Sequence, residues 1–367
     1  MPIQIPPILI EILMNFSIFL IITLSLNLEV GYAGIPQFGR VLAVLAGAIV
    51  AGAIPGRLLV AIYNIQVEWK GETITPLGSE YANHLLNFPI IDQINKNILY
   101  PNPALSILIF ILTLLLAAVF GAVIGYLSSY PALRLREAYL GITLLAFGDA
   151  LKLIAENYQP IVGATQGVFV PNMYGWIGRG GIQFTARIII MLVLAVLIFI
   201  LIERISKSPF GRTLKAMRDS ETAANVYGVN IPRIRGYTLM IGGAIAAIGG
   251  ALYAMYTGSM KALTYDRVTW TFWPWAFMML GGTGNNFGMV LGVFIFTIFR
   301  TLIFSQKFLL EAVIPIQVAW LEYIMIGLVI VLISLFRPQG LIPEKPDPIL
   351  PKNYIEKIRE RVVKKKE

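Results

Sequence analysis

Residues 104–130, ALSILIFILTLLLAAVFGAVIGYLSSY, decide the fold class of this chain because they carry no charged side chain. A transmembrane helix needs roughly 20 consecutive apolar residues, and this stretch is long enough to cross a bilayer. The whole chain has the same character, with 57% hydrophobic residues, 13% charged residues and a mean hydropathy of +0.74. This composition predicts an integral membrane protein.

Further apolar windows along the chain predict a polytopic, all-α helix bundle. They span 8–30, 41–62, 138–155, 185–202, 237–257 and 314–336. The window 270–304 also qualifies, but the run 281–284, GGTG, interrupts it and predicts two shorter segments around a turn. From these windows we expect about 8–10 transmembrane segments, some of them broken or re-entrant.

The residue types present argue against a catalytic or metal-binding site in this chain. It contains no cysteine, which excludes disulfides, thiol catalysis and cysteine-ligated metals, and its one histidine, His84, cannot form a histidine cluster. We therefore expect no catalytic residues, no metal site and no cofactor. His84 has no ligand companions in its loop and is expected at the surface.

The chain has a net charge of +9, and its basic residues cluster in three places. The positions of these clusters predict the orientation of the chain in the membrane. The clusters are the segment 204–236, the short loop with Arg134 and Arg136, and the tail 337–367. The positive-inside rule places all three in the cytoplasm, where the tail can contact anionic lipid, and it accounts for the charge without nucleic-acid binding. The segment 63–103 has an acidic excess and is expected to be an extracytoplasmic loop.

These assignments divide the chain of a multi-pass cell-membrane protein into a transmembrane domain, 1–336, and a basic cytoplasmic tail, 337–367. Counting passes backwards from the cytoplasmic C-terminus puts the N-terminus outside. The N-terminal side stays open, because the linker 31–40, with its glycines and Pro36, can also be a break within one bent helix.

The segment 208–235, SPFGRTLKAMRDSETAANVYGVNIPRIR, is a charged island between two apolar windows. Ser208 and Pro209 predict a helix start, because serine caps free amides and proline is tolerated at the first helical position. The helix would run to about Arg218 with one apolar face and one basic face. The alternative is a solvated loop in which this basic amphipathic helix rests on anionic lipid.

A second short helix is expected after Asp219 or Ser220, and Gly228 is suited to end it in the left-handed conformation. Two short helices joined at a cap would project from the bilayer, with Ala223 and Ala224 on an exposed turn. Small side chains allow another protein to approach closely, so this segment is a candidate docking surface.

The pattern Thr222-Ala223-Ala224, Gly228 and Ile231-Pro232 resembles the EAA loop of the integral-membrane permease subunits of ABC importers. The resemblance implies that this loop docks into a cytoplasmic ATPase. The coupling residues that it implies are Asp219, Glu221, Thr222, Ala223, Ala224 and Gly228. This sequence departs from the motif at Thr222, where glutamate is usual, and Glu221 lies one position earlier.

Five ordered motifs between residues 18 and 341 resemble the branched-chain amino acid permease family, particularly its LivM branch. They are 25–34 (SLNLEVGYAG), 139–149 (YLGITLLAFGD), 208–218 (SPFGRTLKAMR), 280–284 (LGGTG) and 336–341 (FRPQGL). We place a possible translocation path along Asn27, Tyr32, Gly34, Asp149, Lys152, Gly282 and Gly284. The chain departs from the family within 36–40, and its segment 64–102 is longer than usual, so its substrate can differ from leucine, isoleucine or valine.

Charged groups at bilayer depth are costly, so each needs a partner or a place near the interface. Asp149 and Lys152 lie three apart on one helix face and are expected to neutralise each other. Other charged residues lie near predicted span ends, where they are expected to snorkel to the interface. These residues are Glu29, Arg40, Glu137, Arg300 and Glu322.

Three further features have packing or interfacial interpretations. Gly242, Ala246 and Gly250 form a small-residue stripe that lets helices approach closely. The three tryptophans between 270 and 275 are expected in an interfacial aromatic belt. The backbone amides of the glycine turn 282–284 could face an anionic group such as an amino acid carboxylate.

The family resemblance implies a permease subunit of an ABC importer for branched-chain amino acids. The chain has no Walker A sequence, so a partner ATPase would hydrolyse ATP. The other implied partners are a second, LivH-type permease, an extracytoplasmic substrate-binding protein, the amino acid and membrane lipid. Two alternatives stay open: an ion-gradient-driven secondary transporter, and the same ABC role for urea, amides or other amino acids. A membrane-embedded enzyme is disfavoured because no span carries clustered acids.

Overall fold

The computed structural model describes residues 6–69, 72–132, 137–178, 180–306 and 318–344. This part of the chain is mostly helical, and its few strands are two or three residues long. The predicted all-α polytopic fold is therefore confirmed. Arg134, Arg136 and the tail 345–367 lie outside the described residues, as do the side chains of Glu137 and Glu322.

The elements follow one another in a simple order. The first half contains α1 (Pro7–Leu26), the π-helix η1 (Asn27–Tyr32), α2 (Arg40–Tyr63), β1 (Val67–Trp69), β2 (Glu72–Ile74), α3 (His84–Gln93), the π-helix η2 (Ile94–Leu99), α4 (Pro103–Ala132), α5 (Glu137–Asn157), α6 (Gln159–Val162), β3 (Val168–Phe169) and η3 (Gly175–Ile177). The second half contains α7 (Gly181–Lys207), α8 (Pro209–Asp219), α9 (Glu221–Val226), α10 (Ile231–Thr257), β4 (Ser259–Met260), η4 (Ala262–Thr264), the π-helix η5 (Val268–Phe272), α11 (Trp273–Gly281), α12 (Asn286–Ser305) and α14 (Val318–Phe336).

Among the described helices, six are long and apolar enough to cross a membrane. They are Ile8–Tyr32, Arg40–Tyr63, Pro103–Tyr130, Gly181–Lys207, Ile231–Thr257 and Asn286–Ser305. The remaining predicted windows correspond to α5, α11 and α14. α5 contains several charged residues, and α11 is only nine residues long. α11 and α12 are joined by the predicted turn at the glycines, so this window is a broken pair of helices, as expected.

α10 is the central helix, and it packs most extensively against α4 and α2. Glycines allow these backbones to touch: a Cβ on Gly47 would overlap the backbone of Ala247, and one on Gly250 would overlap the backbone of Val44. The predicted small-residue stripe on α10 is thus confirmed as a packing surface. Close backbone contact is how membrane helices associate when apolar burial gives no net driving force.

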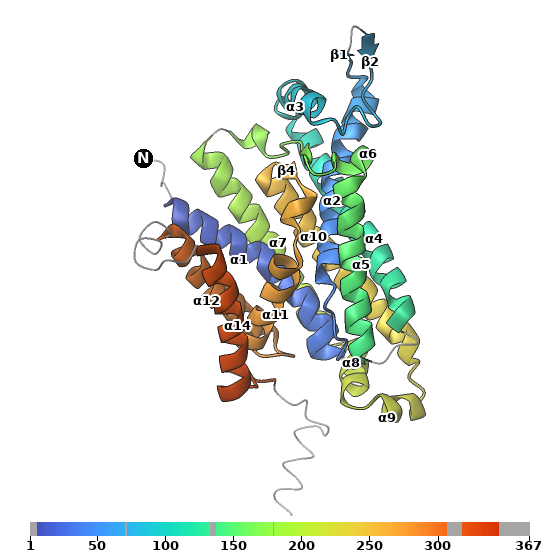
Figure 1. Cartoon of the computed structure of the whole chain (residues 1–367), viewed down its shortest axis with the longest axis vertical. Helices are drawn as coiled ribbons and strands as arrows, with labels where there is room; N and C mark the ends of the chain where they lie inside the picture. The colour runs from blue at the N-terminus through green and yellow to red at the C-terminus, as the bar shows by residue number, and fades with distance from the viewer. Residues whose placement is uncertain (1–5, 70–71, 133–136, 179, 307–317, 345–367) are drawn as a thin grey trace, which may run out of the picture.

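Figure 1 shows β1, β2 and α3 at one end of the bundle and α8 and α9 at the other. The segment 63–103 is more than a loop, since it contains the β1–β2 hairpin, α3 and η2. Asn87 and Asn95 accept hydrogen bonds from the backbone amides of Phe169 and Asn172, at 2.6 and 2.8 Å, and so fix this segment to the β3 region. His84 is half-buried and stacks on Phe169 rather than lying free at the surface.

The linker 31–40 separates two helices rather than bending one. α1 continues through η1 to Tyr32, Gly34 adopts a left-handed φ of 71°, and α2 begins at Arg40. Both flanking helices are long and apolar enough to span a membrane, which favours two passes. The linker residues are largely buried, so they belong to the interior of the bundle.

Candidate functional site

α8 and α9 form the predicted pair of short capped helices. The Oγ of Ser208 accepts a hydrogen bond from the Gly211 amide, at 3.3 Å, and α8 begins at Pro209. The Oγ of Ser220 likewise accepts from the Ala223 amide, at 3.3 Å, and starts α9. Gly228 ends the pair with φ 84°. Serine caps and a left-handed glycine thus set the boundaries that the sequence predicts.

The apolar face of α8 is buried in the protein. Leu214 and Met217 are fully buried, and they belong to a cluster with Leu28 and Tyr32 of α1–η1 and Leu239 of α10. The alternative of a helix whose apolar face rests on lipid is therefore wrong. Because α8 packs against α7 and against η1 at the end of the first span, a displacement of α8 must be accommodated by these two helices.

α9 presents the exposed surface of this helix pair. Thr222 and Ala223 are exposed, but Ala224 is buried, so only one of the two predicted small side chains faces outward. Two large side chains at the end of α9 are also exposed, and the sequence did not predict them: Val226, the last residue of the helix, is 82% exposed, and Tyr227 in the following turn is 88% exposed. Val226 and Tyr227 are large apolar side chains within an otherwise charged and polar segment, and this is the sequence signal for an exposed contact surface.

Arg218, near the end of α8, connects this helix to the segment 31–34 and to the segment after α14. It donates to the carbonyl oxygen of Gly31, and it forms ion pairs with Glu344, at 2.8 Å, and Asp219, at 3.2 Å. A Cβ on Gly34 would lie only 3.0 Å from the Arg218 side chain, so glycine leaves room for it. Burial opposes the charge of Arg218, but the two carboxylates outweigh this effect and raise its pKa.

A buried polar chain continues from this junction into the bundle. The Oδ1 of Asn27 accepts from the Gly284 amide, at 2.9 Å, and its Nδ2 donates to Asn286, at 3.0 Å. Asn286 donates in turn to Glu203, at 2.7 Å, and Glu203 pairs with Lys207. The Gly284 amide is therefore already bonded within the protein, to Asn27.

The glycine turn also holds the segment that follows α14. The amides of Leu341 and Ile342 donate to the carbonyl oxygens of Leu280 and Gly281, at 2.9 and 3.0 Å. Gly282 has φ 110°, and a Cβ there would collide with the carbonyl oxygen of Ile342. This packing brings Glu344 to Arg218. We call the Arg218–Glu344 contact, with the Gly31 carbonyl and the turn 282–284, the α8 junction.

The structure separates the predicted path residues into two groups. The first motif and the glycine turn meet at the α8 junction: Asn27, Tyr32, Gly34, Gly282 and Gly284. Asp149 and Lys152 belong to the other group, on α5. Their predicted mutual ion pair is wrong, because Asp149 pairs with Arg267, at 2.7 Å, and Lys152 pairs with Glu156 one turn further on, at 3.5 Å. Arg267 approaches from a segment distant in sequence, which a helix-face argument cannot anticipate.

Glu29 and Arg40 do not snorkel to an interface. They form an ion pair in which each side chain is 1% exposed, and Arg40 also donates to the Ser25 hydroxyl, at 3.1 Å, and to the Gly242 carbonyl, at 3.0 Å. A Cβ on Gly242 would overlap the Glu29 carboxylate. The linker 31–40 folds Arg40 back beside Glu29, so the cost of burying each charge is offset by the other.

The expected aromatic belt is also corrected. Trp270 and Trp273 are each 1% exposed and belong to the core. The guanidinium of Arg300 lies over the rings of Phe19, Trp273 and Phe304, at 5.4–5.7 Å from their centroids. Aromatic faces stabilise the cation, which is why an arginine is tolerated inside this span.

Within the described ranges, no group of three or more His, Asp or Glu residues could hold a metal ion. The fold and the α8 junction thus define a class of protein: a multi-pass helical membrane protein with a capped helix pair tied to its first and central helices. A family model described as "Branched-chain amino acid transport system / permease component" matches residues 8–334. The chain belongs to this family, and it is therefore a transport subunit rather than an enzyme in its own right.

Individual relatives agree with the family assignment. The chain is 40% identical to the probable branched-chain amino acid transport permease protein LivM of Methanocaldococcus jannaschii, over 91% of this chain and 93% of that protein. It is 27% identical to the high-affinity branched-chain amino acid transport system permease protein LivM of Escherichia coli, over 62% and 56%. It is also 28% identical to the probable LivH permease of M. jannaschii, over 50% and 60%. No solved structure matches the chain.

Proposed function

We propose that this chain is the membrane-spanning subunit of an ABC importer for branched-chain amino acids. An external binding protein delivers the amino acid, and a separate ATPase drives its passage through the bundle. Support for the substrate class comes from relatives named for branched-chain amino acid transport. The resemblance to LivH proteins supports pairing with a second permease of that type.

The observation that carries the coupling role is the construction of the α8–α9 pair. α9 offers an exposed surface built from Thr222, Ala223, Val226 and Tyr227, which fits a protein partner better than water. We assign the predicted coupling residues Asp219 to Gly228 to the docking surface for the ATPase. The α8–α9 end is then cytoplasmic, in agreement with its basic residues, and the α3 end faces the binding protein.

The α8 junction gives this docking surface a mechanical connection. Movement of the ATPase would displace α8, and Arg218 would carry that displacement to the Gly31 carbonyl at the end of η1 and to the segment after α14. A switch of this kind transmits work only if ATP binding has different affinities for the two conformations of the bundle. The proposed path opens alternately to the two sides.

The test is reconstitution of the complete complex in liposomes. With the cognate ATPase, second permease and binding protein, we expect L-leucine to stimulate ATP hydrolysis and to accumulate inside the vesicles. The proposal fails if no branched-chain amino acid stimulates hydrolysis while another substrate, such as urea or an amide, does. Uptake by this chain alone, driven by an ion gradient, would instead establish the secondary-transporter alternative.

A further inference from the structure

The outward surface of α5 differs from the outward surfaces of α4 and α7. Within 105–127 of α4 and 182–201 of α7, every exposed side chain is apolar or aromatic, as contact with lipid tails requires. α5 also lies at an edge of the bundle, and Figure 1 shows it on the other side from α12 and α14. Unlike α4 and α7, α5 carries charged side chains that are partly exposed there.

An ion pair lies on this outward side of α5. Asp149 pairs with Arg267, at 2.7 Å, and the two side chains are 33% and 47% exposed. Lys152 and Glu156 form a second, less exposed pair on the same helix, at 3.5 Å. A guanidinium has five N–H donors, which is more than one carboxylate accepts in a two-bond contact. The rest of the Arg267 guanidinium therefore needs acceptors from whatever covers this side of α5.

The pair lies within the depth of the membrane. Asp149 is about two helical turns before the end of α5 at Asn157. A Cβ on the neighbouring Gly148 would meet Val41 and Leu42, so this part of α5 packs against α2 at the beginning of its span. α2 in turn crosses the central helix α10 at Gly250, inside the span Ile231–Thr257. The ion pair thus lies beside two spanning helices rather than beyond their ends.

Lipid tails are a poor cover for such a pair. They offer no acceptor or donor to the exposed part of the two side chains, and burial of polar groups without hydrogen bonds is costly. Water can reach this depth only where protein encloses it. The side of α5 that carries Asp149 is therefore suited to contact with another protein that contributes polar groups.

The shape of this surface suits a second membrane helix. Ala146 and Ala150 lie one turn apart on the exposed side of α5, next to the exposed side chains of Ile142 and Leu153. Small residues at four-residue spacing let the backbones of two membrane helices approach closely. We call the exposed side of α5 from Ile142 to Leu153, together with Arg267, the α5 face.

We infer that the α5 face is the contact surface for the second, LivH-type permease. A membrane helix of that permease packs on Ala146 and Ala150, and its polar groups complete the hydrogen bonds of Arg267 and Asp149. This inference rests on the proposed function, which it deepens by naming the face of the chain on which the two permeases meet.

The first test is photo-crosslinking in the complete complex in liposomes. The photoreactive amino acid p-benzoylphenylalanine replaces Leu153, which is 57% exposed on the α5 face. We expect a covalent adduct with the second permease, identified by mass spectrometry. The matched control is the same replacement at Leu115, which is 59% exposed on the apolar surface of α4 and should give no protein adduct.

The second test measures association by co-purification from detergent. Ala150→Trp should reduce recovery of the second permease about tenfold, equivalent to about 1.4 kcal/mol, because the bulky ring prevents close approach. Val119→Trp, on the exposed surface of α4, is the control and should leave recovery unchanged. Both variants of the full chain should keep the wild-type melting temperature, since neither position is buried.

The double variant Asp149→Leu, Arg267→Leu separates a polar partner from lipid. If the second permease completes the hydrogen bonds of this pair, the variant should also reduce its recovery, because the polar groups of the partner are left without bonds. If lipid covers the α5 face, the variant should associate as well as wild type and melt at a higher temperature. That result would overturn the inference.

The outcomes also separate this inference from the proposed function. If liposomes accumulate leucine but the adduct forms from position 115 and not from position 153, the α5 face is not the contact surface while the transport function stands. An adduct of position 153 with a second copy of this chain, or with lipid alone, would overturn the assigned occupant. If the wild-type complex accumulates no amino acid, the proposed function fails, whereas an adduct of position 153 with the second permease would still support the α5 face.

Discussion

Glu29 and Arg40 form an ion pair whose side chains are both 1% exposed, and the chain that contains them has few charged residues. Removing one partner of a buried pair leaves the other charge uncompensated and costs about 3–5 kcal/mol. We expect Arg40→Met to lower the thermal stability of the purified protein in detergent strongly. The double variant Glu29→Gln, Arg40→Met should recover much of this loss, because no charge remains buried.

The comparison is made by thermal unfolding of the single and double variants. A control is Lys96→Met, which removes one partner of the exposed Lys96–Asp92 pair and should change stability by less than about 1 kcal/mol. Equal melting temperatures for wild type and Arg40→Met would show that the pair does not support the fold.

At the residue scale, sequence reasoning succeeds where the cause is local. Ser208, Ser220 and Gly228 act on neighbouring amides or on their own φ angle, and their roles were predictable from their types and spacing. The partners of Glu29 and Asp149 were not predictable. Arg40 reaches Glu29 through the folded linker 31–40, and Arg267 reaches Asp149 across the bundle, so both pairs depend on tertiary structure.

At the scale of elements, α9 is the proposed contact with the ATPase, and Ala223 is its exposed small residue. Ala223→Glu places a bulky charge on this surface without touching the core. We expect this variant to insert and fold normally but to lose at least about tenfold in leucine-stimulated ATP hydrolysis, equivalent to about 1.4 kcal/mol of docking free energy. Co-purification of the ATPase with the variant provides a second measurement.

Thr222→Glu is the matched control for that variant, because it adds the same charge one position earlier, where the resembling motif usually has glutamate. We expect it to retain coupling. If both variants couple as well as wild type, α9 is not the docking surface. If both variants lose coupling equally, the loss results from the added negative charge, and a specific contact at Ala223 is not supported.

α8 is connected to the rest of the bundle by the Arg218–Glu344 ion pair, at 2.8 Å. Arg218→Glu places a third carboxylate beside Asp219 and Glu344 and removes the donor to the Gly31 carbonyl. We expect it to reduce leucine uptake per ATP hydrolysed. The exchanged pair Arg218→Glu, Glu344→Arg should restore part of the ratio, since it restores the attraction but not the bond to Gly31. The ratio of uptake to hydrolysis in liposomes measures this, and an unchanged ratio in the single variant would contradict the proposed connection.

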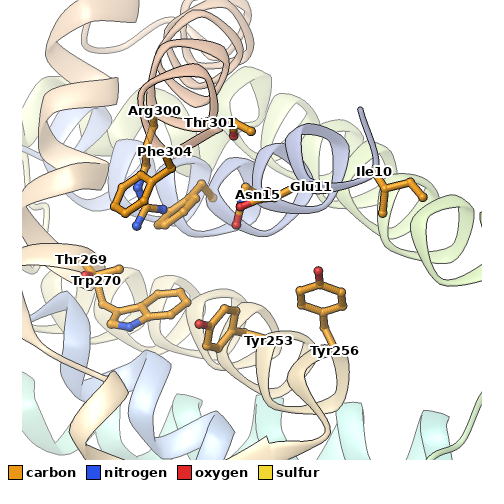
Figure 2. Close-up of a pocket in the computed structure, with 11 residues that line it drawn as sticks. Ile10, Glu11, Asn15, Tyr253, Tyr256, Thr269, Trp270, Arg300, Thr301 and Phe304 are labelled. Carbon is orange, nitrogen blue, oxygen red and sulfur yellow. The ribbon is translucent and has the colours of Figure 1, made fainter. Parts of the chain in front are cut away.

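The sequence predicts whole elements well when a hydrophobic window or a cap defines them. The long windows became helices, and the glycine run broke one of them between Gly281 and Asn285. Prediction from the sequence failed where the burial of a side chain depends on its neighbours in the tertiary structure. Tryptophans at these positions resemble an interfacial belt, but η5 and α11 place Trp270 and Trp273 in the core. Trp273 packs beside Phe277 and Phe296, and Trp270 stacks on Phe19 and Tyr265. A cavity of about 420 Å³ beside Arg300 (Figure 2) was equally unpredictable, because its lining comes from α1, α10, η5 and α12, which are distant in sequence.

At the scale of the whole molecule, the bundle is built around α10, and its stability depends on close backbone contact with α2. Gly47 is one of the two positions where that contact is closest, because any Cβ there overlaps the backbone of Ala247. Gly47→Val would force α2 and α10 apart and remove packing along both helices, at a cost of about 1–3 kcal/mol or more. Gly327 on α14 offers a matched control, since a Cβ there meets no atom within 4 Å. We expect Gly327→Val to yield monodisperse protein in size-exclusion chromatography with an unchanged melting temperature, and Gly47→Val to aggregate or melt well below wild type. Equal behaviour of the two variants would show that the α2–α10 contact does not hold the bundle together.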